Sequence, residues 1–578
     1  MKSLKLLLTL LGASIMLAAC TAATVRTEAS GEIKGGRLEL SDAPTLIRHG
    51  NEVMISYYEA SGRLMLRHPD GAELALNGDE LKDARSSFNV LHSDGEGLYA
   101  LWRPKLTKAV EGVGGPGDKL VYFRASLDGG KNFGPIHRLN QKGGAFKPFI
   151  ASSGKGDLYV AYTDERNSGS DIDIYLNVSH DRGSSWKKED IQLDGSESRM
   201  SFNPSVVADG DRVYVSWMTK TYAKEFKIFV RASADRGETW QAPVAAHVSL
   251  DQPATPALIK TGKGLLLCWG DVDAVRCASS ADHAKSWSNS VAVEDSKGAA
   301  GLIVAADPKG HAHLLIAQKP EQEKARVNLF HVRSADGRVF SKPRRLNGGT
   351  PYMASTILPT LDFGDDGSVL ATWVDMRYLR PVIAANYSHD GGNTWLGQDV
   401  VLGARKGMWN FFPAVAYGGS GKYSIAWQES ANRSDPTSLI AKIEYRPGST
   451  GVAMPKPDVA RLKERADTFW RLREEGKWEQ VYELLDPFFR EGSSASVYAK
   501  SQGAVKYHGH ELVGEPEIDG VRATVQVSYD SEVPELMLKG KKVSVPRTTV
   551  QIPQEWIWVD GEWYHVFRDL FGGSTLIE

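Results

Sequence analysis

Eight short apolar runs recur along most of the chain at similar intervals. They are VMISYY from Val53, LYALW from Leu98, LYVAY from Leu158, VYVSW from Val213, LLLCW from Leu265, HLLIA from His313, VLATW from Val369 and YSIAW from Tyr423. Each run is rich in β-branched and aromatic residues and is bounded by Gly or Asp, which is typical of short buried strands. Regular recurrence of one such unit predicts a repeat architecture rather than one continuous sheet.

A second, polar pattern keeps step with these runs. The stretches SHDRGSSW at 179–186, SADRGETW at 233–240 and SHDGGNTW at 388–395 share the spacing Ser-x-Asp-x-Gly-x-x-Trp. With the weaker copies at 68–74, 126–133, 280–287 and 334–340, the series of aspartates is Asp70, Asp128, Asp181, Asp235, Asp282, Asp336 and Asp390. The Ser and Asp side chains can accept hydrogen bonds from their own loop, Gly tolerates a turn, and Trp can pack between sheets. We therefore predict a structural turn rather than a reactive site.

These loops resemble the Asp boxes, or bacterial neuraminidase repeats, of sialidases and other β-propellers. The resemblance covers about Arg37 to Tyr445, and it implies an all-β propeller, assigned here to residues 37–446. Propellers carry many unrelated functions, so the fold does not imply sialidase activity. Eight strand copies favour eight blades and seven boxes leave seven as the alternative, whereas sialidases have six. We expect Arg37 to Leu40 to pair with the last sheet, because closing the ring removes exposed sheet edges.

The pattern changes after Arg446. Residues 447–456 form a Pro/Gly-containing linker, and Val459, Leu462, Ala466, Phe469 and Trp470 then follow the spacing of one helix face. Alternating strands follow, and Asp560-Gly561 between two aromatic runs predicts a hairpin. Residues 457–578 resemble the cone-shaped α+β fold of nuclear transport factor-like and SnoaL-like domains, which often hold a small ligand or pair with another subunit. We interpret Phe469, Trp470, Trp556, Trp558 and Trp563 as core rather than as a ligand cage.

The first nineteen residues have the order of a secretion signal. Lys2 and Lys5 precede an apolar run that is too short for a membrane span, and the run ends in Leu17-Ala18-Ala19-Cys20. This ending resembles the bacterial lipobox, which implies cleavage before Cys20 and lipidation of that residue. Residues 20–36 are then a lipidated tether. The resemblance places the protein in a bacterial cell envelope, with the outer membrane favoured because Thr21 rather than Asp follows Cys20; an ordinary signal with an incidental Cys is the alternative.

Composition narrows the possible partners. Lys plus Arg is 69 against 71 for Asp plus Glu, and no nucleic-acid, phosphate-loop or zinc-binding motif is present, so we expect no nucleic-acid partner, no cofactor and no metal. Cys268 and Cys277 flank a predicted hairpin turn at 271–274 and would face each other across it. An envelope location permits a disulfide there, and two buried thiols are the alternative.

Candidate binding residues follow from propeller geometry. The connections after the second strands and before the first strands gather at one end of the central channel, opposite the boxes. The ligand-binding candidates in these connections are Arg85, Arg103, Arg166, Arg199, Arg377 and Trp409. Converging guanidinium groups suit an anionic ligand, because they bind carboxylates with two hydrogen bonds. The alternative for the repeated Asp-x-Arg at Asp164/Arg166 and Asp375/Arg377 is an ion pair that ties one loop to its neighbour.

Catalytic residues are harder to assign. Sialidases use an arginine triad, a Tyr activated by Glu and an acid/base Asp, and the Phe/Tyr-Arg-Ile-Pro motif of that family is missing here. The candidates are Asp164, Asp375, Glu429 and Tyr352. The sequence therefore predicts an envelope protein that binds an acidic glycan and leaves hydrolysis open. The alternative is a non-catalytic scaffold that docks an envelope protein through a broad face.

Overall fold

The computed structural model describes residues 33–35 and 43–567, except for 80, 83, 107, 110–113, 141–143, 169–170, 196–197, 255, 319–326, 348–357, 377–380, 398, 404–407, 431–437, 447–456, 520, 539–540 and 560. Cys20 and Arg37 to Leu40 lie outside these residues. Within the described part, no helix is both long and apolar enough to cross a membrane.

The described residues are mostly β, with seven four-stranded antiparallel sheets and one eight-stranded sheet. Each of the eight predicted runs forms the second strand of its unit. The first four units are β2 (Thr45–His49), β3 (Glu52–Tyr58), β4 (Leu64–Arg67), β5 (Glu73–Ala75); β6 (Arg85–Ser93), β7 (Leu98–Lys105), β8 (Tyr122–Ser126), β9 (His137–Arg138); β10 (Ala145–Ser152), β11 (Leu158–Ser168), β12 (Asp171–Ser179), β13 (Ile191–Gln192); and β14 (Ser198–Asp209), β15 (Arg212–Thr221), β16 (Phe226–Ser233), β17 (Val244–Ser249). The third and fourth of these units make up the eight-stranded sheet, because one parallel pair, Ile172 with Met200, joins them.

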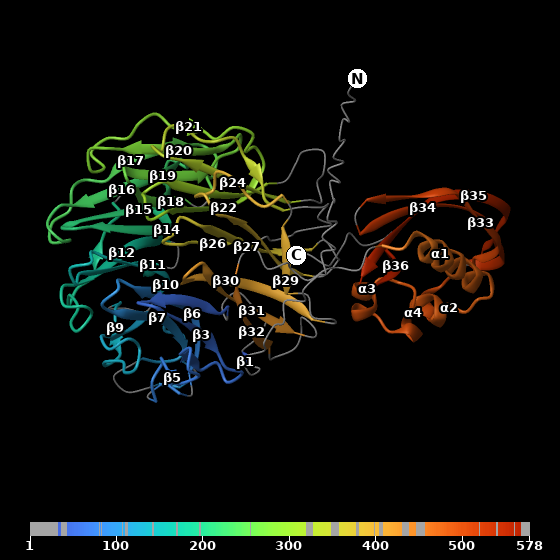
Figure 1. The fold of residues 1–578 in the computed structure, drawn as a ribbon, viewed down its shortest axis with the longest axis horizontal. Coiled ribbons are helices and arrows are strands. Elements are labelled where there is room, and N and C mark those ends of the chain that lie inside the picture. Colours follow the sequence, from blue (N-terminus) through green and yellow to red (C-terminus); the bar gives the residue numbers. More distant parts are fainter. Residues whose placement is uncertain are drawn as a thin grey trace, which may run out of the picture.

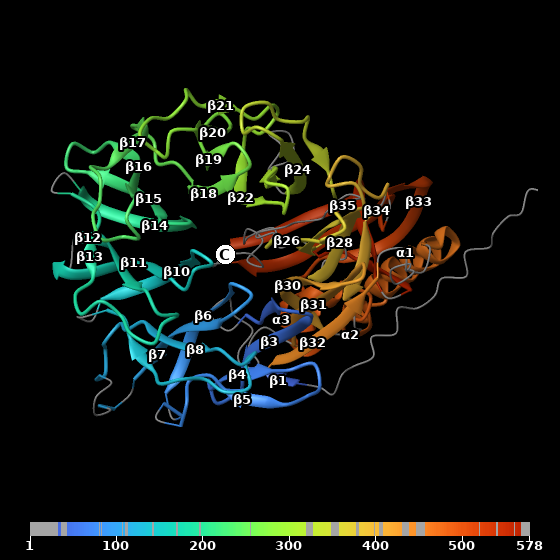
Figure 2. The same ribbon diagram turned by 60° about the vertical axis from the view of Figure 1, so that its left-hand side comes forward.

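The remaining units of the same kind continue in chain order. They are β18 (Ala257–Thr261), β19 (Gly264–Gly270), β20 (Val275–Ser280), β21 (Val291–Ala292); β22 (Ala299–Ala306), β23 (Ala312–Gln318), β24 (Asn328–Ser334), β25 (Arg344–Arg345); β26 (Thr360–Phe363), β27 (Val369–Asp375), β28 (Val382–Ser388), β29 (Val400–Gly403); and β30 (Trp409–Gly419), β31 (Lys422–Ser430), β32 (Ser438–Tyr445) with β1 (Ile33–Gly35). Figure 2 shows these sheets arranged around a common centre, with their first strands innermost. The arrangement is consistent with the sialidase-like propeller expected from the sequence.

The ring closes through an N-terminal strand, but at a different position from the predicted one. The strand that pairs with β32 is β1, in which Ile33 faces Ile440 and Gly35 faces Ser438. The expected tether over 20–36 therefore ends in a strand of the last sheet. The short β1 covers the edge of β32, as closure requires, and β30 contacts β2 of the first sheet.

The antiparallel order of each sheet defines two faces of the ring. The connections between second and third strands, and those from a fourth strand to the next sheet, emerge on what we call the mouth face. The Asp boxes connect third to fourth strands and emerge on the opposite face, which we call the box face. The predicted separation of boxes and binding loops follows directly from this strand order.

Each box is a self-contained hydrogen-bonded turn. In the box of the third sheet, Ser179 Oγ donates to Asp181 (2.8 Å) and accepts from the Gly183 amide (2.8 Å), and Asp181 accepts from the Ser185 amide (2.8 Å). Gly183 has a φ of +83°, and a Cβ there would lie 2.3 Å from the Phe123 ring. The same bonds recur around Asp128, Asp235 and Asp390. The box is thus a turn that also fits a neighbouring core.

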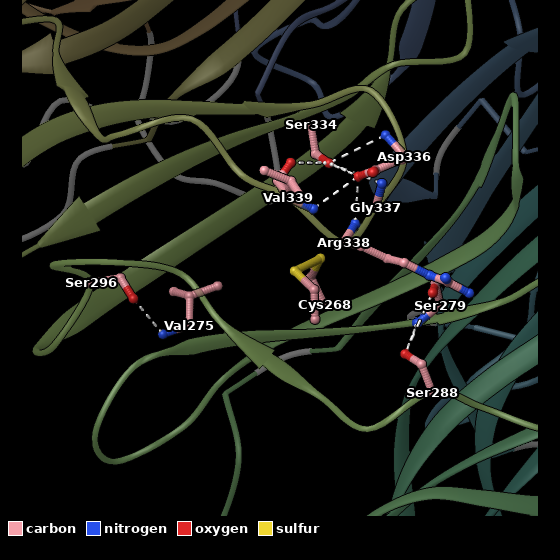
Figure 3. Close-up of a disulfide and its surroundings, with 11 residues drawn as sticks. Cys268, Val275, Ser279, Ser288, Ser296, Ser334, Asp336, Gly337, Arg338 and Val339 are labelled. Carbon is pink, nitrogen blue, oxygen red and sulfur yellow. Dashed lines mark hydrogen bonds between the residues drawn. A yellow bond between two sulfur atoms is a disulfide. The ribbon is translucent and has the colours of Figure 1, made fainter.

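Cys268 and Cys277 face each other on β19 and β20 and are joined by a disulfide (Figure 3). The Asp271 amide donates to the Ala274 carbonyl (2.8 Å), which closes the hairpin between the strands. Both cysteines are buried among apolar residues shared by the fifth and sixth sheets. The cross-link therefore ties two adjacent strands inside one sheet.

The C-terminal part combines helices with one antiparallel sheet. Its elements are α1 (Val459–Glu474), α2 (Trp478–Tyr482), α3 (Pro487–Gly492), α4 (Ala495–Ser501), β33 (Lys506–Asp519), β34 (Arg522–Leu538), β35 (Lys541–Val559) and β36 (Glu562–His565). Val559 pairs with Glu562 at the predicted hairpin, and Asp560 lies outside the described residues. Four of the five predicted helix-face residues are buried, whereas Val459 is 41% exposed because it is the first residue of α1, beyond the reach of the sheet. The five aromatic residues expected in the core are all buried, and the Arg473 guanidinium lies 4.6 Å from the Trp470 ring and 4.3 Å from the Tyr507 ring.

The C-terminal part packs on the mouth face of the ring (Figure 1). Trp409, the first residue of β30, is buried with Ile557, Val559 and Val566 of the C-terminal part. A second contact joins Val382 and Val401, at the mouth ends of β28 and β29, to Val521 before β34. The C-terminal part therefore covers the mouth ends of the seventh and last sheets.

Candidate functional site

The second strands end at the mouth face with a repeated hydrogen bond. The indole Nε1 of a Trp donates to a side chain two residues further on in Trp217–Thr219 (3.0 Å), Trp373–Asp375 (3.1 Å) and Trp427–Glu429 (3.0 Å). Asp375 and Glu429 are each 3% exposed. Two of the predicted catalytic carboxylates, Asp375 and Glu429, thus each accept a hydrogen bond from an indole of their own strand.

Asp164 and Arg166 belong to a buried ion-pair cluster. Arg166 donates to Asp164 (2.6 Å) and to both carboxylate oxygens of Asp190 (2.8 and 2.6 Å), and its guanidinium lies 3.9 Å from the Tyr175 ring centre. The Arg166 side chain is 6% exposed and the two acids 0% and 4%. Burial raises the pKa of Asp164, and Arg166 opposes this shift. Of the two interpretations of this Asp-x-Arg, the geometry matches the ion pair, because the guanidinium already binds two carboxylates.

Arg103 differs from Arg166 because no carboxylate among the described residues forms an ion pair with it. It follows the buried Trp102 on β7, and its guanidinium lies 5.5 Å from the ring centre of Phe88 on β6. Burial lowers the pKa of Arg103, with Glu165 opposing, and its Nε is buried without a hydrogen-bond partner among the described residues. Glu165 itself is paired with Lys119. Arg103 is therefore a partly desolvated cation at the mouth.

The innermost strands bulge at the mouth. Register shifts occur between Ser87 and Val90, Phe146 and Phe149, Phe202 and Ser205, and Phe411 and Ala414. Phe88, Asn203 and Phe412, inside these bulges, have φ values of 54°, 55° and 55°, a region that non-glycine residues rarely adopt. Bulges re-aim side chains and are common near functional sites. Here they leave Phe88 and Phe149 38% and 41% exposed.

The other predicted site residues are dispersed. Arg85 begins β6 and Arg199 is exposed on β14, both at the mouth. Trp409 is 7% exposed beneath the C-terminal part, so its observed role is packing between domains, which the sequence could not indicate. Arg377 and Tyr352 lie outside the described residues.

The sequence interpretation missed a repeated latch at the mouth. After four of the fourth strands comes Leu followed by Asn or Asp, at Leu76-Asn77, Leu139-Asn140, Leu193-Asp194 and Leu346-Asn347. The polar side chain accepts from a backbone amide in the third strand or directly before it, at Val121 for Asn140 (2.9 Å), Ile174 for Asp194 (3.2 Å) and Leu329 for Asn347 (2.9 Å). Recurrence of the dipeptide in step with the boxes was the available signal.

Asp194 is the ionisable member of this set, whereas the equivalent residues Asn77, Asn140 and Asn347 are neutral. It is 8% exposed, and burial raises its pKa to about 6. Its Oδ2 is buried without a partner among the described residues. In that same part of the chain, no group of three or more His, Cys, Asp or Glu is placed to hold a metal ion.

The arrangement of the sheets is consistent with a sialidase-like propeller, and comparison with solved structures returns sialidases and a polysaccharide lyase at low sequence identity. The chain is similar to the NanB sialidase from Streptococcus pneumoniae at 9% identity, covering 72% of this chain and 94% of that one with a TM-score of 0.35. It is similar to the intramolecular trans-sialidase from Ruminococcus gnavus at 12% identity, covering 64% and 95% with a TM-score of 0.35. It is also similar to a PL25 ulvan lyase at 14% identity, covering 65% and 94% with a TM-score of 0.38. No protein-family model and no curated protein matches the chain.

Proposed function

We propose that this protein binds an acidic glycan on the mouth face of its propeller, over the second to fourth sheets. The observation that carries the proposal is Arg103, a half-buried cation near the Phe88 ring that has no hydrogen-bonded carboxylate among the described residues. An anionic group placed beside it would supply the missing charge and acceptor. The exposed rings of Phe88 and Phe149 offer apolar surface for a sugar face.

The overall organisation forms part of the same proposal. We count the eight-stranded sheet as two blades, which makes eight blades with the last one closed by β1. The C-terminal part is proposed to be a cone-shaped domain of the nuclear transport factor-like type, since a helix packs its apolar face on a curved antiparallel sheet. Docked on the seventh and last sheets, it bounds the proposed glycan site on one side.

Binding is favoured over hydrolysis. A glycosidase needs two carboxyl groups that face a common pocket at a fixed separation. Asp164, Asp375 and Glu429 are each buried and accept from Arg166 or an indole of their own sheet. These three acids therefore stabilise strand ends, and a catalytic role would need other residues.

The proposed test measures binding to polysaccharides. Arg103→Gln in the full-length protein is expected to weaken binding of an acidic polysaccharide about tenfold, or about 1.4 kcal/mol. Arg212→Gln removes the same charge from the box-face end of β15 and is the matched control. Equal binding by Arg103→Gln and wild type would refute the mouth site, and turnover of a fluorogenic sialoside would refute the binding-only interpretation.

We propose a lipid anchor at Cys20, which would hold the ring to an envelope membrane. The apolar run and the Leu-Ala-Ala-Cys ending support it. Cys20→Ser is expected to move the protein from the membrane fraction to the soluble fraction. Retention of the variant with membranes would contradict lipidation at that residue.

A scaffold function is the second candidate, and one observation favours it. The distal parts of β34 and β35 expose apolar residues, namely Met537 (64%), Val543 (38%), Val545 (45%) and Val550 (36%). Val543 and Val545, two residues apart on β35, point to the same face of the sheet, and neighbouring exposed apolar groups are typical of a protein interaction surface. Co-purification of an envelope protein that is lost in Val543→Lys/Val545→Lys, with glycan binding unchanged, would assign this surface to a partner.

A further inference from the structure

The Asp box of the sixth sheet differs from the others in length and hydrogen bonding. Ser334 to Phe340 is one residue shorter than the full motif, and Phe340 stands where four other boxes have Trp. Asp336 accepts from the amides of Arg338 and Val339 (both 2.8 Å), two and three residues further on, rather than from the fourth (Figure 3). Ser334 Oγ also donates to the Val339 carbonyl (2.6 Å). This tighter turn changes the surface between the sixth and seventh sheets.

The residue before the box serine is also different in this sheet. That position holds Arg333 in the sixth sheet, whereas the other boxes that begin with Ser have Ala125, Val178, Ala232, Ser279 and Tyr387; the first box, which begins with His68, has Arg67 there. The stretch after the box contributes Lys342 and Arg344. Three cations therefore gather where one copy departs from the repeat.

A cavity of about 580 Å³ lies between this box and the box of the seventh sheet. Arg333, Lys342, Arg344, Phe340, Ser341 and Trp395 are among its lining residues, and none of the residues that line it is Asp or Glu. Small-molecule sites typically have volumes of about 300–1,000 Å³. The cavity is therefore large enough for a sugar unit and has a positive lining.

Arg333 forms no direct ion pair with a described residue. Its guanidinium donates to Asn393 Oδ1 (2.5 Å) and lies 3.0 Å from His311 Nδ1, which is itself 2.9 Å from Asp307 Oδ2, and its Nε is buried without a partner in the described part of the chain. Arg166 at the mouth, in contrast, is bound by two carboxylates. Lys342 and Arg344 are exposed at the cavity and form no ion pair with a described residue. The charges of Lys342 and Arg344 are thus available to an anion, whereas Arg333 is linked to the Asp307 carboxylate through His311.

The wall of the cavity is aromatic and neutral. Trp395 Nε1 donates to His331 Nδ1 (3.2 Å), and the two rings lie 4.8 Å apart. Burial lowers the pKa of His331 well below its usual value, so its ring is uncharged at neutral pH. Aromatic surface beside a hydroxyl group (Ser341) and three cations suits a saccharide that carries an anionic group, better than it suits a bare inorganic anion.

We propose that the cavity between the boxes of the sixth and seventh sheets binds a carboxylate- or sulfate-bearing saccharide unit. Arg333 and Arg344 donate to the anionic group, Lys342 adds positive charge at the rim, and the partly exposed ring of Phe340 contacts the sugar. This site lies on the box face, so it is separate from the proposed mouth site and does not depend on it.

The experiment is calorimetric titration of the full-length protein with four probes. They are a uronic acid disaccharide, a sulfated disaccharide, the neutral parent disaccharide and inorganic sulfate. We expect at least one of the two anionic disaccharides to bind at least tenfold more tightly than the neutral parent and than inorganic sulfate, with weaker binding at higher salt. The uronic and sulfated arms distinguish the carboxylate from the sulfate ester.

Three variants locate the binding. Lys342→Gln/Arg344→Gln should lose at least tenfold in affinity, and both residues are exposed, so the fold should persist. Lys131→Gln/Lys285→Gln removes two exposed charges from other boxes of the same face and should bind as wild type does. Arg103→Gln, at the mouth, should also leave this affinity unchanged.

Several outcomes would overturn the proposal. Wild-type affinity in Lys342→Gln/Arg344→Gln would remove the site, as would equal loss in the Lys131/Lys285 control. Equal affinity for the neutral disaccharide would exclude anion recognition, and equal affinity for inorganic sulfate would exclude saccharide recognition. Tighter binding of a single-stranded oligonucleotide of matched charge would reassign the cavity to a different class of ligand.

Discussion

The aspartates of the Asp boxes and those at the mouth differ in exposure and in pKa. On the box face, hydrogen bonds from the residue four positions further on hold the pKa of Asp128, Asp235 and Asp282 at about 2. At the mouth, Asp164 and Asp194 are 0% and 8% exposed, and burial raises the pKa of both. The ionised form of Asp is thus stabilised on the box face, where its pKa is lowered, and destabilised at the mouth, where its pKa is raised.

The difference shows what a repeated aspartate contributes in each place. A box aspartate finds all its donors within its own turn and keeps contact with water, so ionisation costs little. A mouth aspartate is buried between sheets. Its negative charge is destabilised there unless a cation from another segment, such as Arg166, pairs with it. Three predictions test this contrast, in order of decreasing effect.

The largest effect is expected at Arg166. Arg166→Met leaves Asp164 and Asp190 buried without their cation, which should lower the free energy of unfolding by about 3–5 kcal/mol. Arg182→Gln is the control, because its partner Glu96 is 67% exposed and such surface pairs contribute less than about 1 kcal/mol. Urea denaturation compares the two variants. Similar losses would show that burial does not separate the two faces.

Asp194→Asn should stabilise the protein at neutral pH. Asn retains the acceptor for the Ile174 amide and removes a charge whose pKa is raised by burial to about 6. The folded state binds the proton more tightly than the unfolded state, so wild-type stability should fall as the pH rises from about 4 to about 6 and stay level above. A shift of about two pKa units corresponds to about 3 kcal/mol, the upper limit of the gain expected in the variant at pH 7.5.

The pH dependence supplies the check on this prediction. Thermal unfolding at pH 4 should show little difference between wild type and Asp194→Asn, because the carboxyl is protonated in the folded state there. The reverse change in the neighbouring latch, Asn140→Asp, should destabilise the protein at pH 7.5. A gain in Asp194→Asn that is the same at both pH values would argue against ionisation as the cause.

The smallest effect is expected at a box. Asp181→Ala removes the acceptor for the Ser185 amide and for Ser179 Oγ, which should lower the free energy of unfolding by about 1–2 kcal/mol. Binding at the mouth should not change, because the box lies on the opposite face. Chemical denaturation and glycan titration of the same variant test both statements. A loss of glycan affinity with unchanged stability would contradict a structural role.

The periodic parts of the molecule were predictable because their determinants are local. The run LYVAY became β11 and the Asp560-Gly561 pair marked the β35–β36 turn, since strand period and turn chemistry act within a few residues. The closing strand was placed at Arg37 to Leu40 but lies at Ile33–Gly35, because its position depends on its partner β32 rather than on its own pattern. Trp409 resembled a binding residue in the loop pattern, and only the docked C-terminal part shows that it is covered.

The candidate site illustrates the same limit. Asp164 and Arg166 were recognised as a pair from their spacing, but Asp190, which completes the cluster, is contributed by the segment before β13 and carries no signal in the sequence. The latch at Asn140 and Asp194 repeats a visible dipeptide, yet the raised pKa of Asp194 depends on burial between two sheets.

By itself, the sequence determined the repeated units, the self-contained turns and the change of pattern after Arg446, because hydrogen bonds and strand periodicity in those segments are satisfied by near neighbours. The tertiary structure alone decided which charges are neutralised and which surfaces remain open. Arg166 is paired, Arg103 and Arg333 have no ion pair with a described carboxylate, and the mouth ends of the seventh and last sheets are covered. Burial and long-range pairing set those outcomes, and both depend on segments that meet only after the ring has closed.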